Sequence, residues 1–343
     1  MAHYLITGHT GFKGAWLIFL LKARGHEVSG LALDPLPGSL FERADLAQDL
    51  THDFRVDIRD REKTHKAFQE VQPDYVVHMA AQALVREGYR NPLLTYETNV
   101  SGTLNVLQAI EETNSVRAQL IVTTDKVYLN RGLNRPYVET DSLGGKDPYS
   151  ASKAMADILS QEWLGRDGAT PGAIARAGNV IGAGDISVDR LIPDIVRATE
   201  SRKKIDIRYP KAIRPWQHVL DCLNGYLTIL AEVEKESRVR VWNIGPKATD
   251  SHSVEQVVQQ AHDFLGLPVV TFNKSVSQPP EESYLLLDAE RANNVLGWRD
   301  KLSFELALKD SLAEAMSAQA WEPRKHIQRV TFEFEALDVE EVR

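Results

Sequence analysis

Short apolar runs alternate with longer amphipathic stretches through the first half of the chain. The apolar runs lie at Tyr4–Thr7, Glu27–Leu31, Tyr75–Met79 and Gln119–Thr123, with a further strand expected near Ala173–Arg176. The helix-like stretches lie at Phe12–Arg24, Glu62–Glu70 and Asn99–Glu112, with a further helix expected after Tyr149. Buried strands that alternate with helices predict a parallel sheet joined by right-handed crossovers. We therefore expect an α/β fold of the doubly wound kind.

This alternation loosens after about Gly178, where Pro-, Arg- and Asp-rich connections become common. We predict a strand in Val241–Pro246 and a helix over Ser253–Leu265. The tail contains "RVTFEFEAL", whose period-two pattern is typical of a strand. The chain thus divides into residues 1–178, residues 179–320 and a tail of residues 321–343.

Composition excludes several classes of protein. The 343 residues carry a net charge of -8 and no basic tail, which argues against a nucleic-acid-binding protein. The single cysteine, Cys222, excludes an internal disulfide and is typical of a reducing compartment. Neither a signal peptide nor an apolar run of about 18 residues is evident, so we expect a soluble, cytoplasmic protein.

Three glycines, Gly8, Gly11 and Gly14, stand between the first predicted strand and the first predicted helix. Each glycine inside a helix costs about 1 kcal/mol, so this spacing indicates a junction where something approaches the backbone closely. In this strand-to-helix context the glycines favour the pyrophosphate of a dinucleotide, held by N–H groups at the helix N-terminus. An ordinary tight turn is the alternative interpretation.

Two acidic residues follow at positions suited to the rest of a dinucleotide. Asp34 ends the second predicted strand, about 20 residues after Gly14, where a carboxylate can accept hydrogen bonds from ribose hydroxyls. A carboxylate there would repel a 2′-phosphate, which favours NAD over NADP. A turn aspartate before Pro35 is the alternative. Asp57 is a candidate for the adenine amino group, although it could equally lie in a solvated loop.

A tyrosine and a lysine stand four residues apart in "DPYSASK". On a helix Tyr149 and Lys153 share one face, and an ammonium group beside a phenol lowers its pKa from about 10 toward neutrality. Tyr149 is therefore a candidate base toward an alcohol, with a solvated helix face as the alternative. The preceding strand ends in "VTTDKVY", which places Thr123–Lys126 at the ligand-binding edge of the sheet. A surface ion pair of Asp125 and Lys126 is the alternative there.

These motifs, with "TGHTGFKGAWL", "HMAAQ", "RAGNVIGAGD" and "RPWQHV", resemble the extended short-chain dehydrogenase/reductases that act on nucleotide sugars. Within that family the chain is most similar to the CDP-glucose 4,6-dehydratases. The resemblance implies a Rossmann domain with a seven-stranded parallel sheet over residues 1–178, with elements interleaved from the second half. It also implies a smaller α/β substrate-binding region over residues 179–320, tightly held NAD and a homodimer.

The implied reaction is that of a lyase. A nucleoside-diphosphate glucose, with CDP-glucose favoured, would become its 4-keto-6-deoxy product by oxidation at carbon 4, loss of water across carbons 5 and 6, and hydride return to carbon 6. The alternatives are a dehydratase of another nucleotide sugar such as a UDP-N-acetylhexosamine, or a 4-epimerase. A non-catalytic NAD-sensing scaffold is disfavoured because Tyr149 and Lys153 are both present.

The resemblance assigns residues to each part of the site. The cofactor contacts would be Gly8, Thr10, Gly11, Phe12, Lys13, Gly14, Asp34, Asp57, Ile58, Ala80, Ala81, Gln82, Asn99, Tyr149 and Lys153. The substrate contacts would be Arg86, Asn179, Arg190, Leu191, Arg208, Arg214 and His218. Arginine suits bidentate contact with a diphosphate. Packing is the alternative role for His218 and its neighbour Trp216, and no metal is expected because the histidines lack ligand spacing.

Five residues would carry the chemistry. Tyr149, aided by Lys153, would take the proton of the carbon-4 hydroxyl, and Thr124 would hydrogen-bond that oxygen. Asp125 suits the acid that protonates the departing oxygen, provided that burial raises its pKa. Lys126 suits the base that removes the carbon-5 hydrogen, and the opposite assignment of the two stays open.

Overall fold

The structure is a computed structural model. It describes residues 1–133, 135–201, 207, 209–235, 241–247, 251–266, 285–317 and 320–340. Of the predicted site residues, Arg208 lies outside the described residues.

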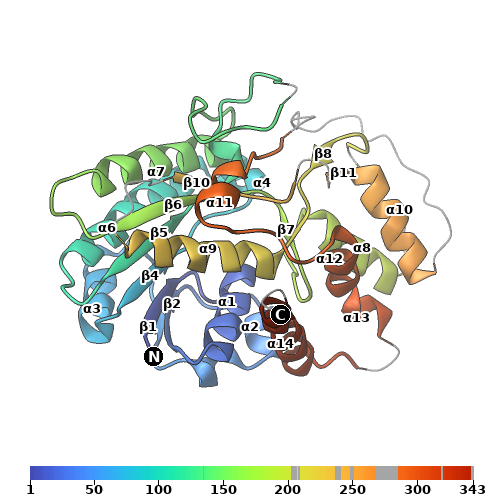
Figure 1. The fold of residues 1–343 in the computed structure, drawn as a ribbon, viewed down its shortest axis with the longest axis horizontal. Helices are drawn as coiled ribbons and strands as arrows, with labels where there is room; N and C mark the ends of the chain where they lie inside the picture. The colour runs from blue at the N-terminus through green and yellow to red at the C-terminus, as the bar shows by residue number, and fades with distance from the viewer. Residues whose placement is uncertain are drawn as a thin grey trace.

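Seven parallel strands form the central sheet, in the order β10-β6-β5-β4-β1-β2-β3 (Figure 1). They are β1 (His3–Thr7), β2 (Glu27–Ala32), β3 (Asp53–Arg55), β4 (Tyr75–His78), β5 (Ala118–Val122), β6 (Gly172–Ala177) and β10 (Val241–Ile244). The order runs outward in both directions from β1, which pairs with β2 on one side and β4 on the other. The crevice at the carboxyl ends of β1 and β4 is where such sheets bind ligands.

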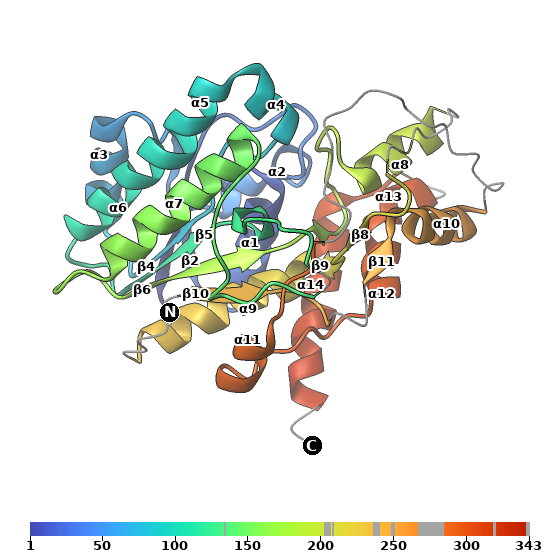
Figure 2. The same ribbon diagram turned by 90° about the horizontal axis from the view of Figure 1, so that it is seen from above.

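Helices cover both faces of this sheet (Figure 2). One face carries α3 (Arg61–Val71), α6 (Thr103–Glu111) and α7 (Pro148–Leu164), with the short helices α4 (Val85–Arg90) and α5 (Pro92–Tyr96) beside α7. The other face carries α1 (Phe12–Ala23) and α9 (Val219–Val233), with α14 (Pro323–Glu340) packed against α1. The minor elements are α2 (Leu40–Arg43), α11 (Glu290–Val295), 3₁₀ turns at Leu46–Asp49 and Asp125–Val127, and a π-helical turn at Glu97–Gly102.

A smaller region lies beside the carboxyl edge of the sheet (Figure 1). It contains α8 (Leu191–Glu200), α10 (Val254–Leu265), α12 (Phe304–Ser311) and α13 (Ala313–Met316), with the strands β7 (Val180–Ile181), β8 (Ile213–Arg214), β9 (Gln217–His218) and β11 (His252–Ser253). Strands β7 and β9 pair in parallel, and β8 and β11 pair antiparallel. The region has a hydrophobic cluster of its own, built from residues such as Ile195, Trp216, Val258 and Leu308.

Most of the predicted elements are present. The six predicted strands of the sheet are confirmed within two residues at each end, and Val241–Ile244 from the second half joins the sheet beside β6. The sequence analysis missed β3, which has three residues and no buried run. The predicted helix over Asn99–Glu112 begins as the π-helical turn and continues as α6.

The predicted strand in the tail is wrong, because this segment is part of helix α14. Its buried residues are Ile327, Thr331 and Phe334, which are spaced by four and three and so share one helical face. Phe332, which the period-two pattern placed on the buried face with Phe334, is 75% exposed. The alternation of aromatic and acidic residues resembles the pattern of a strand. The buried residues instead follow the longer period of a helix.

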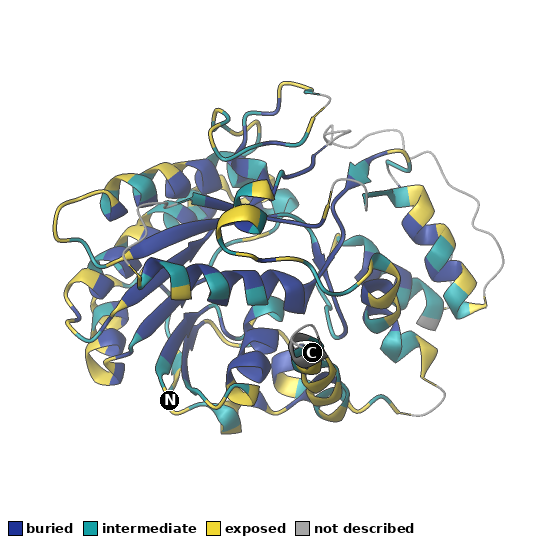
Figure 3. Ribbon diagram, viewed as in Figure 1, coloured by how far each residue is buried: buried dark blue, intermediate teal, exposed yellow. Residues whose placement is uncertain are grey.

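The strands of the sheet other than β3 are mostly buried, as are the inner faces of the helices that cover the sheet (Figure 3). Apolar side chains of α1 and α9 fill one side of the sheet, and those of α3 and α6 fill the other. Within the part of the chain that the structure describes, no helix is long and apolar enough to span a bilayer.

Candidate active site

The glycine-rich turn closes directly over the carboxyl ends of β1 and β4. Gly8 has a φ of +78°, and a Cβ atom there would lie 2.8 Å from the Ala80 backbone nitrogen. A Cβ atom on Gly14 would lie 2.5 Å from the Gly8 oxygen, so the turn excludes larger residues at both positions. Helix α1 starts at Phe12, and its N-cap residue Gly11 makes no side-chain cap hydrogen bond. The first N–H groups of α1 therefore have no side-chain cap from Gly11, and their contact with a pyrophosphate stays a prediction.

The carboxyl end of β2 presents the predicted ribose contact. The Asp34 side chain is 89% exposed and lies 3.9 Å from the Arg55 guanidinium, which also binds Asp53 at 2.6 Å. Thr10 donates a hydrogen bond to the Leu33 carbonyl at 3.1 Å and so fixes the turn against β2. Asp34 is thus accessible to a ribose from outside, with an arginine beside it that sequence analysis missed.

A buried histidine also lies under this end of the site. The His9 ring occupies the space next to Gly30, where a Cβ atom would come within 2.2 Å of the ring. Its Nε2 atom lies 2.8 Å from Asp53 Oδ1. A glycine in the middle of a predicted strand was the signal for this close contact.

Two predicted cofactor contacts, Asp57 for the adenine amino group and Ile58, lie after β3. Asp57 accepts hydrogen bonds from the Arg59 backbone and guanidinium, and this side-chain pairing lowers the pKa of Asp57. Ile58 is buried against the π-helical turn that precedes α6, where a Cβ atom on Gly102 would meet its side chain at 2.6 Å. Asp57 is therefore held as an anion by Arg59, and an adenine contact through it stays a prediction.

The loop after β4 is tied to the helix that carries the tyrosine and lysine. The Gln82 backbone donates to Asn99 Oδ1 at 2.8 Å, and Asn99 Nδ2 donates to the Gln82 carbonyl at 3.1 Å. Asn99 also donates to Ser152 of α7 at 2.9 Å. Ala80 donates its backbone N–H to Thr7 at 3.2 Å. The structure thus brings the ends of β1 and β4 together with α7.

Helix α7 positions Tyr149 and Lys153. Its N-cap residue Asp147 accepts a hydrogen bond from the Ser150 backbone at 2.9 Å, which starts the helix one residue before Tyr149. Lys153 is buried, and its Nζ atom donates to the Val122 carbonyl at 2.9 Å. Burial and the charge of Lys13 lower the pKa of Lys153 to about 8, although the charge of Asp157 acts to raise it.

The expected direction of the Tyr149 pKa shift is wrong for the protein alone. Burial raises the pKa of Tyr149 to about 12, and a hydrogen bond with Thr124 only partly opposes this. Lys153 does not offset the burial, because its ammonium group is directed at the β5 carbonyl. Tyr149 and Thr124 are nonetheless close enough to hydrogen-bond to each other. Their predicted shared contact with the carbon-4 hydroxyl of the substrate requires this proximity.

Asp125 satisfies the condition that sequence analysis set for it. The residue is 3% exposed and accepts a hydrogen bond from Thr124 at 2.9 Å. Burial raises the pKa of Asp125, although Lys126, Thr124 and Arg214 all act to lower it. This carboxyl group therefore holds a proton more tightly than an exposed aspartate does. Lys126 is half-buried and follows it in the same 3₁₀ turn.

Cations of the smaller region approach the same place. Arg214 of β8 is 9% exposed, and its charge acts on Asp125. Arg190, whose charge acts on Tyr149, lies 3.9 Å from Asp185. From the layer that covers the sheet, Arg86 of α4 donates to Asp189 at 2.6 Å.

Two other predicted substrate contacts have roles in packing. The Asn179 carbonyl accepts a hydrogen bond from the Gln217 backbone at 3.4 Å, and Leu191 packs against the cluster of the smaller region. The Asn179 side chain and the Leu191 backbone are not used in these contacts. A substrate role for them stays a prediction.

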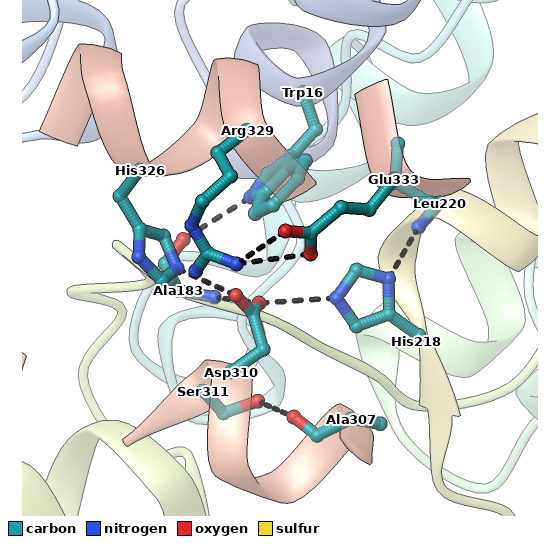
Figure 4. A network of polar contacts seen from close by, with 10 residues as sticks. All are labelled: Trp16, Ala183, His218, Leu220, Ala307, Asp310, Ser311, His326, Arg329 and Glu333. Atoms are coloured by element: carbon teal, nitrogen blue, oxygen red, sulfur yellow. Dashed lines mark hydrogen bonds and ion pairs between the residues drawn. The ribbon is translucent and has the colours of Figure 1, made fainter. Parts of the chain in front are cut away.

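His218 is a correction to the predicted substrate contacts. Its side chain is fully buried, its Nδ1 atom accepts from the Leu220 backbone at 3.1 Å, and its Nε2 atom lies 3.0 Å from Asp310 Oδ2 (Figure 4). Asp310 also bonds His326 of α14 and the Ala183 backbone. Both ring nitrogens of His218 bond to other groups of the protein. The structure therefore supports the packing role of His218 and contradicts the substrate contact.

Two further groups near the site were missed. Arg176 and Asp157 form a fully buried ion pair at 2.7 Å, and Thr123 donates to Asp157 at 2.9 Å. On the other side of the sheet, Lys13 donates to the Tyr226 hydroxyl at 2.9 Å. An arginine in a buried strand was the available signal for the first. Nothing local in the sequence links Lys13 to Tyr226. In the described residues, no group of three His, Cys, Asp or Glu side chains could hold a metal ion.

One family of known proteins matches most of the chain. The family model described as GDP-mannose 4,6 dehydratase matches residues 5–311. The chain belongs to this family. A CDP-glucose 4,6-dehydratase of Salmonella typhimurium is 40% identical over 307 residues, which are 86% of this chain and 85% of the relative. A dTDP-glucose 4,6-dehydratase of Xanthomonas campestris is 28% identical, with 94% and 95% of the two chains covered.

Solved structures of similar enzymes share the fold. A dTDP-glucose 4,6-dehydratase from Streptomyces venezuelae, with NAD and DAU bound, superposes with a TM-score of 0.82 at 24% identity, over 92% of this chain and 97% of that one. The enzyme of the same name from Bacillus anthracis, in complex with NAD, gives a TM-score of 0.80 at 22% identity, over 95% and 100%. This protein therefore has the same fold as these enzymes.

Proposed function

We propose that this protein is an NAD-dependent 4,6-dehydratase of a nucleoside-diphosphate glucose, with CDP-glucose as its substrate. The observation that carries the proposal is the buried Asp125, whose raised pKa suits an acid and which lies next to Thr124, Tyr149 and Lys126. The 40% identical relative that bears the name CDP-glucose 4,6-dehydratase supports the choice of sugar nucleotide. The NAD-bound relatives of the same fold support the cofactor.

The residues of the glycine-rich turn and the exposed Asp34 would hold NAD, which would supply the hydride acceptor and donor of a closed redox cycle. Oxidation at carbon 4 makes the neighbouring hydrogen on carbon 5 acidic. Tyr149 accepts the proton of the carbon-4 hydroxyl, and Thr124 holds the oxygen as it becomes a ketone. In the protein alone the Lys153 ammonium is directed at the Val122 carbonyl and does not lower the pKa of Tyr149, so phenolate formation would need this ammonium to turn toward the Tyr149 hydroxyl.

Loss of water needs an acid and a base beyond this set. Lys126 removes the proton from carbon 5, the C–O bond at carbon 6 breaks, and the proton of Asp125 goes to the departing hydroxyl to form water. The resulting Lys126 ammonium returns a proton to carbon 5 as carbon 6 is reduced, and the proton that Tyr149 took from the carbon-4 hydroxyl can restore the acid form of Asp125. Arg214 and Arg190 would neutralise the substrate diphosphate.

A panel of nucleotide sugars tests this function. The protein, CDP-glucose and the analogous dTDP-, UDP- and GDP-linked sugars are incubated separately, and the alkaline absorbance of a 4-keto product is followed. We expect CDP-glucose to give the fastest rise. A faster rise with another nucleotide base would overturn the choice of substrate and keep the dehydratase. A 4-epimer without a keto product would overturn the dehydratase itself.

We also propose that two copies pair through α6 and α7. Leu104 of α6 and Met155 and Ile158 of α7 are 37%, 49% and 55% exposed, on the outer surface of the sheet's helical layer. Large apolar side chains that cluster on a surface indicate a contact with another molecule. Light scattering should give the mass of a dimer, and Ile158→Lys should shift it toward that of a monomer. Exposed Val295 of α11 provides the control, because Val295→Lys should leave the mass unchanged.

A further inference from the structure

Thr123–Tyr128, here called the site segment, carries three of the five predicted catalytic residues. Two backbone hydrogen bonds inside it, to the Thr124 and Asp125 carbonyls, measure 3.3 and 3.4 Å. A third, from the Lys126 N–H group to the Thr124 hydroxyl, measures 3.3 Å. Strong bonds of this kind measure about 2.9–3.0 Å, so these three hold the turn weakly. The positions of its side chains therefore depend on what holds the two ends of the segment.

Helix α7, which packs against β6 and against the turn of the site segment, holds the first end (Figure 2). Thr123 is buried, and its hydroxyl donates to Asp157 Oδ2 at 2.9 Å. The carbonyl of the preceding residue, Val122, accepts from Lys153 Nζ at 2.9 Å. Lys153 and Asp157 stand four residues apart and so share one face of the helix. Two successive residues at the end of β5 are thus bonded to two successive turns of α7.

Strands β6 and β10 hold the far end of the site segment. Tyr128 is buried, and Arg176 Nη1 of β6 donates to its hydroxyl at 3.0 Å. The guanidinium also lies 4.9 Å from the centroid of the Tyr128 ring. The same hydroxyl donates to Asn243 Oδ1 of β10 at 2.6 Å, and the Tyr128 backbone forms an isolated bridge with Leu143. The side chain two positions after Lys126 is therefore fixed from the sheet.

One buried ion pair joins these two ends. Asp157 accepts from Arg176 Nε at 2.8 Å and from Nη2 at 2.7 Å, and the two side chains are 0% and 1% exposed. This bidentate contact leaves Nη1 of the guanidinium for Tyr128 and for the Glu139 carbonyl. A buried ion pair adds little stability compared with apolar residues of similar volume, because both charges lose their hydration. This pair instead supplies one fixed hydrogen-bonding group to each end of the site segment.

We propose that Asp157 and Arg176 are positioning residues for the site segment. The carboxylate fixes the end that precedes Thr124, and the guanidinium fixes the end that follows Lys126. Because a displacement of about 1 Å at the reacting groups can slow a reaction about 100-fold, fixing both ends matters more for the rate than for stability. The reaction that this serves rests on the proposed function, whereas the tethering of the segment does not.

Two small deletions break the tethers and leave the ion pair intact. Thr123→Val removes the hydroxyl that bonds Asp157, whose carboxylate keeps both of its bonds from Arg176. Tyr128→Phe removes the hydroxyl that Arg176 bonds, and Nη1 of this arginine keeps the Glu139 carbonyl. Neither variant leaves a buried charge without a partner, so both should fold.

Two matched controls delete buried hydroxyls that bond other parts of the chain. Ser160→Ala removes a hydroxyl of α7 that donates to the Ala156 carbonyl at 2.7 Å. Tyr75→Phe removes a hydroxyl that donates to Glu234 at 2.6 Å, at the start of β4 and so at the edge of the sheet opposite the site. Thermal unfolding curves of all four variants show that each one folds.

Hydrogen exchange measures the tethers without any turnover. The full chain as purified is labelled with deuterium, and a peptide that spans the site segment is followed by mass spectrometry. Its backbone amides should exchange about three- to tenfold faster in Thr123→Val and in Tyr128→Phe, because each variant has lost one bond that opposes local opening. The two controls should leave this exchange unchanged. Native exchange in either tether variant would overturn a segment held at both ends.

Steady-state kinetics with the preferred nucleotide sugar measure what the tethers do for the reaction. Both tether variants should lower kcat about tenfold or more and keep KM within about twofold, because the proposed diphosphate cations lie in the smaller region. The controls should keep kcat within about twofold. Faster exchange at a native kcat, or a changed KM at a native kcat, would overturn the positioning role. If the native protein turns over no nucleotide sugar, the proposed function fails while hydrogen exchange still decides the tethering.

Arg176→Lys tests the arginine itself. Lysine keeps a positive charge beside Asp157, but its ammonium group lacks the planar fork that bonds Asp157 twice and reaches Tyr128 as well. It should speed exchange and lower kcat as Tyr128→Phe does, and native values of both would overturn the role of Arg176. If this variant does not fold, Thr123→Val and Tyr128→Phe decide the proposal.

Discussion

His326 Nε2 lies 2.7 Å from Asp310 Oδ1 and so ties the C-terminal helix α14 to α12 of the smaller region. The same carboxylate bonds His218 at the start of α9 and the Ala183 backbone (Figure 4). Four separate segments of the chain therefore meet at one buried anion. The family model ends at residue 311, just beyond Asp310, so α14 adds to the fold outside the matched part.

Asp310→Asn should destabilise the protein, because an amide cannot accept from all three donors. Loss of one such buried bond costs about 1–3 kcal/mol, measured as a shift in the urea midpoint at constant m-value. Arg329→Ala is the control in the same view, because Arg329 pairs with Glu333 on the exposed face of α14 at 2.8 Å. That surface pair should contribute no more than about 0.5 kcal/mol. Equal shifts of the urea midpoint in the two variants would show that the buried carboxylate contributes no more to stability than the surface pair does.

The same residue predicts how stability depends on pH. Burial favours the neutral acid, but hydrogen bonds from His218 and His326 outweigh it and hold the pKa of Asp310 well below its usual range. A carboxyl group with a depressed folded pKa contributes stability above its unfolded pKa of about 4, and loses it as the pH falls toward the folded pKa. Urea midpoints between pH 6 and pH 3 should therefore fall less steeply in Asp310→Asn than in the native protein. Parallel profiles would contradict the assignment.

The purified protein should carry NAD, because a closed redox cycle gains nothing from releasing its cofactor. Protein denatured by heat or acid would release it for chromatography. The accessible carboxylate of Asp34 at the end of β2 is expected to exclude a 2′-phosphate. NADP as the main nucleotide would contradict that role and would direct attention to Arg55, which lies 3.9 Å away.

Arg214→Met should raise the KM for the nucleotide sugar about 10- to 100-fold, because a charge-assisted hydrogen bond contributes about 1.5–3 kcal/mol. The content of NAD should not change. Arg166→Met is the control, since Arg166 pairs with Glu162 on the surface at the far end of α7. Equal loss of NAD from Arg214→Met would place this residue at the cofactor instead of the diphosphate.

The sequence predicted well those parts of the molecule that local patterns determine. The order of strands and helices follows from buried runs, and the glycine-rich turn from the steric limits at Gly8 and Gly14. The position of Thr123–Lys126 at the ligand-binding edge of the sheet was expected because these residues follow a predicted strand, and β5 does end at Val122. Each of these needs only neighbours along the chain.

Contacts between distant segments were not predictable in this way. His218 bonds Asp310, which lies 92 positions away in the sequence. Because of this bond, His218 is not a substrate contact. The shift of the Tyr149 pKa depended on where the Lys153 ammonium points, which the spacing of the two residues does not determine. In the tail, the buried spacing of Ile327, Thr331 and Phe334 was hidden by a stronger alternating pattern.

Lys126 separates the proposed dehydratase from an epimerase most directly. If Tyr149, Lys153 and Thr124 carry out oxidation alone, Lys126→Met should still generate the NADH absorbance when substrate is added. Removal of the carbon-5 hydrogen should fail, so neither the 4-keto-6-deoxy product nor solvent deuterium at carbon 5 should accumulate. Loss of one acid or base typically slows a reaction by about 10²–10⁴-fold, or about 3–5 kcal/mol of barrier.

Two companion variants show which step has failed. Tyr149→Phe should block the first hydride transfer and leave the NAD spectrum unchanged after substrate is added. Asp125→Asn keeps the acceptor for Thr124 but holds no transferable proton, so deuterium should enter carbon 5 while the 4-keto-6-deoxy product forms slowly. Exchange lost in Asp125→Asn and retained in Lys126→Met would reverse the two roles. If Lys126→Met turns over at a near-normal rate, the lysine takes no part in the elimination, and the base is another residue.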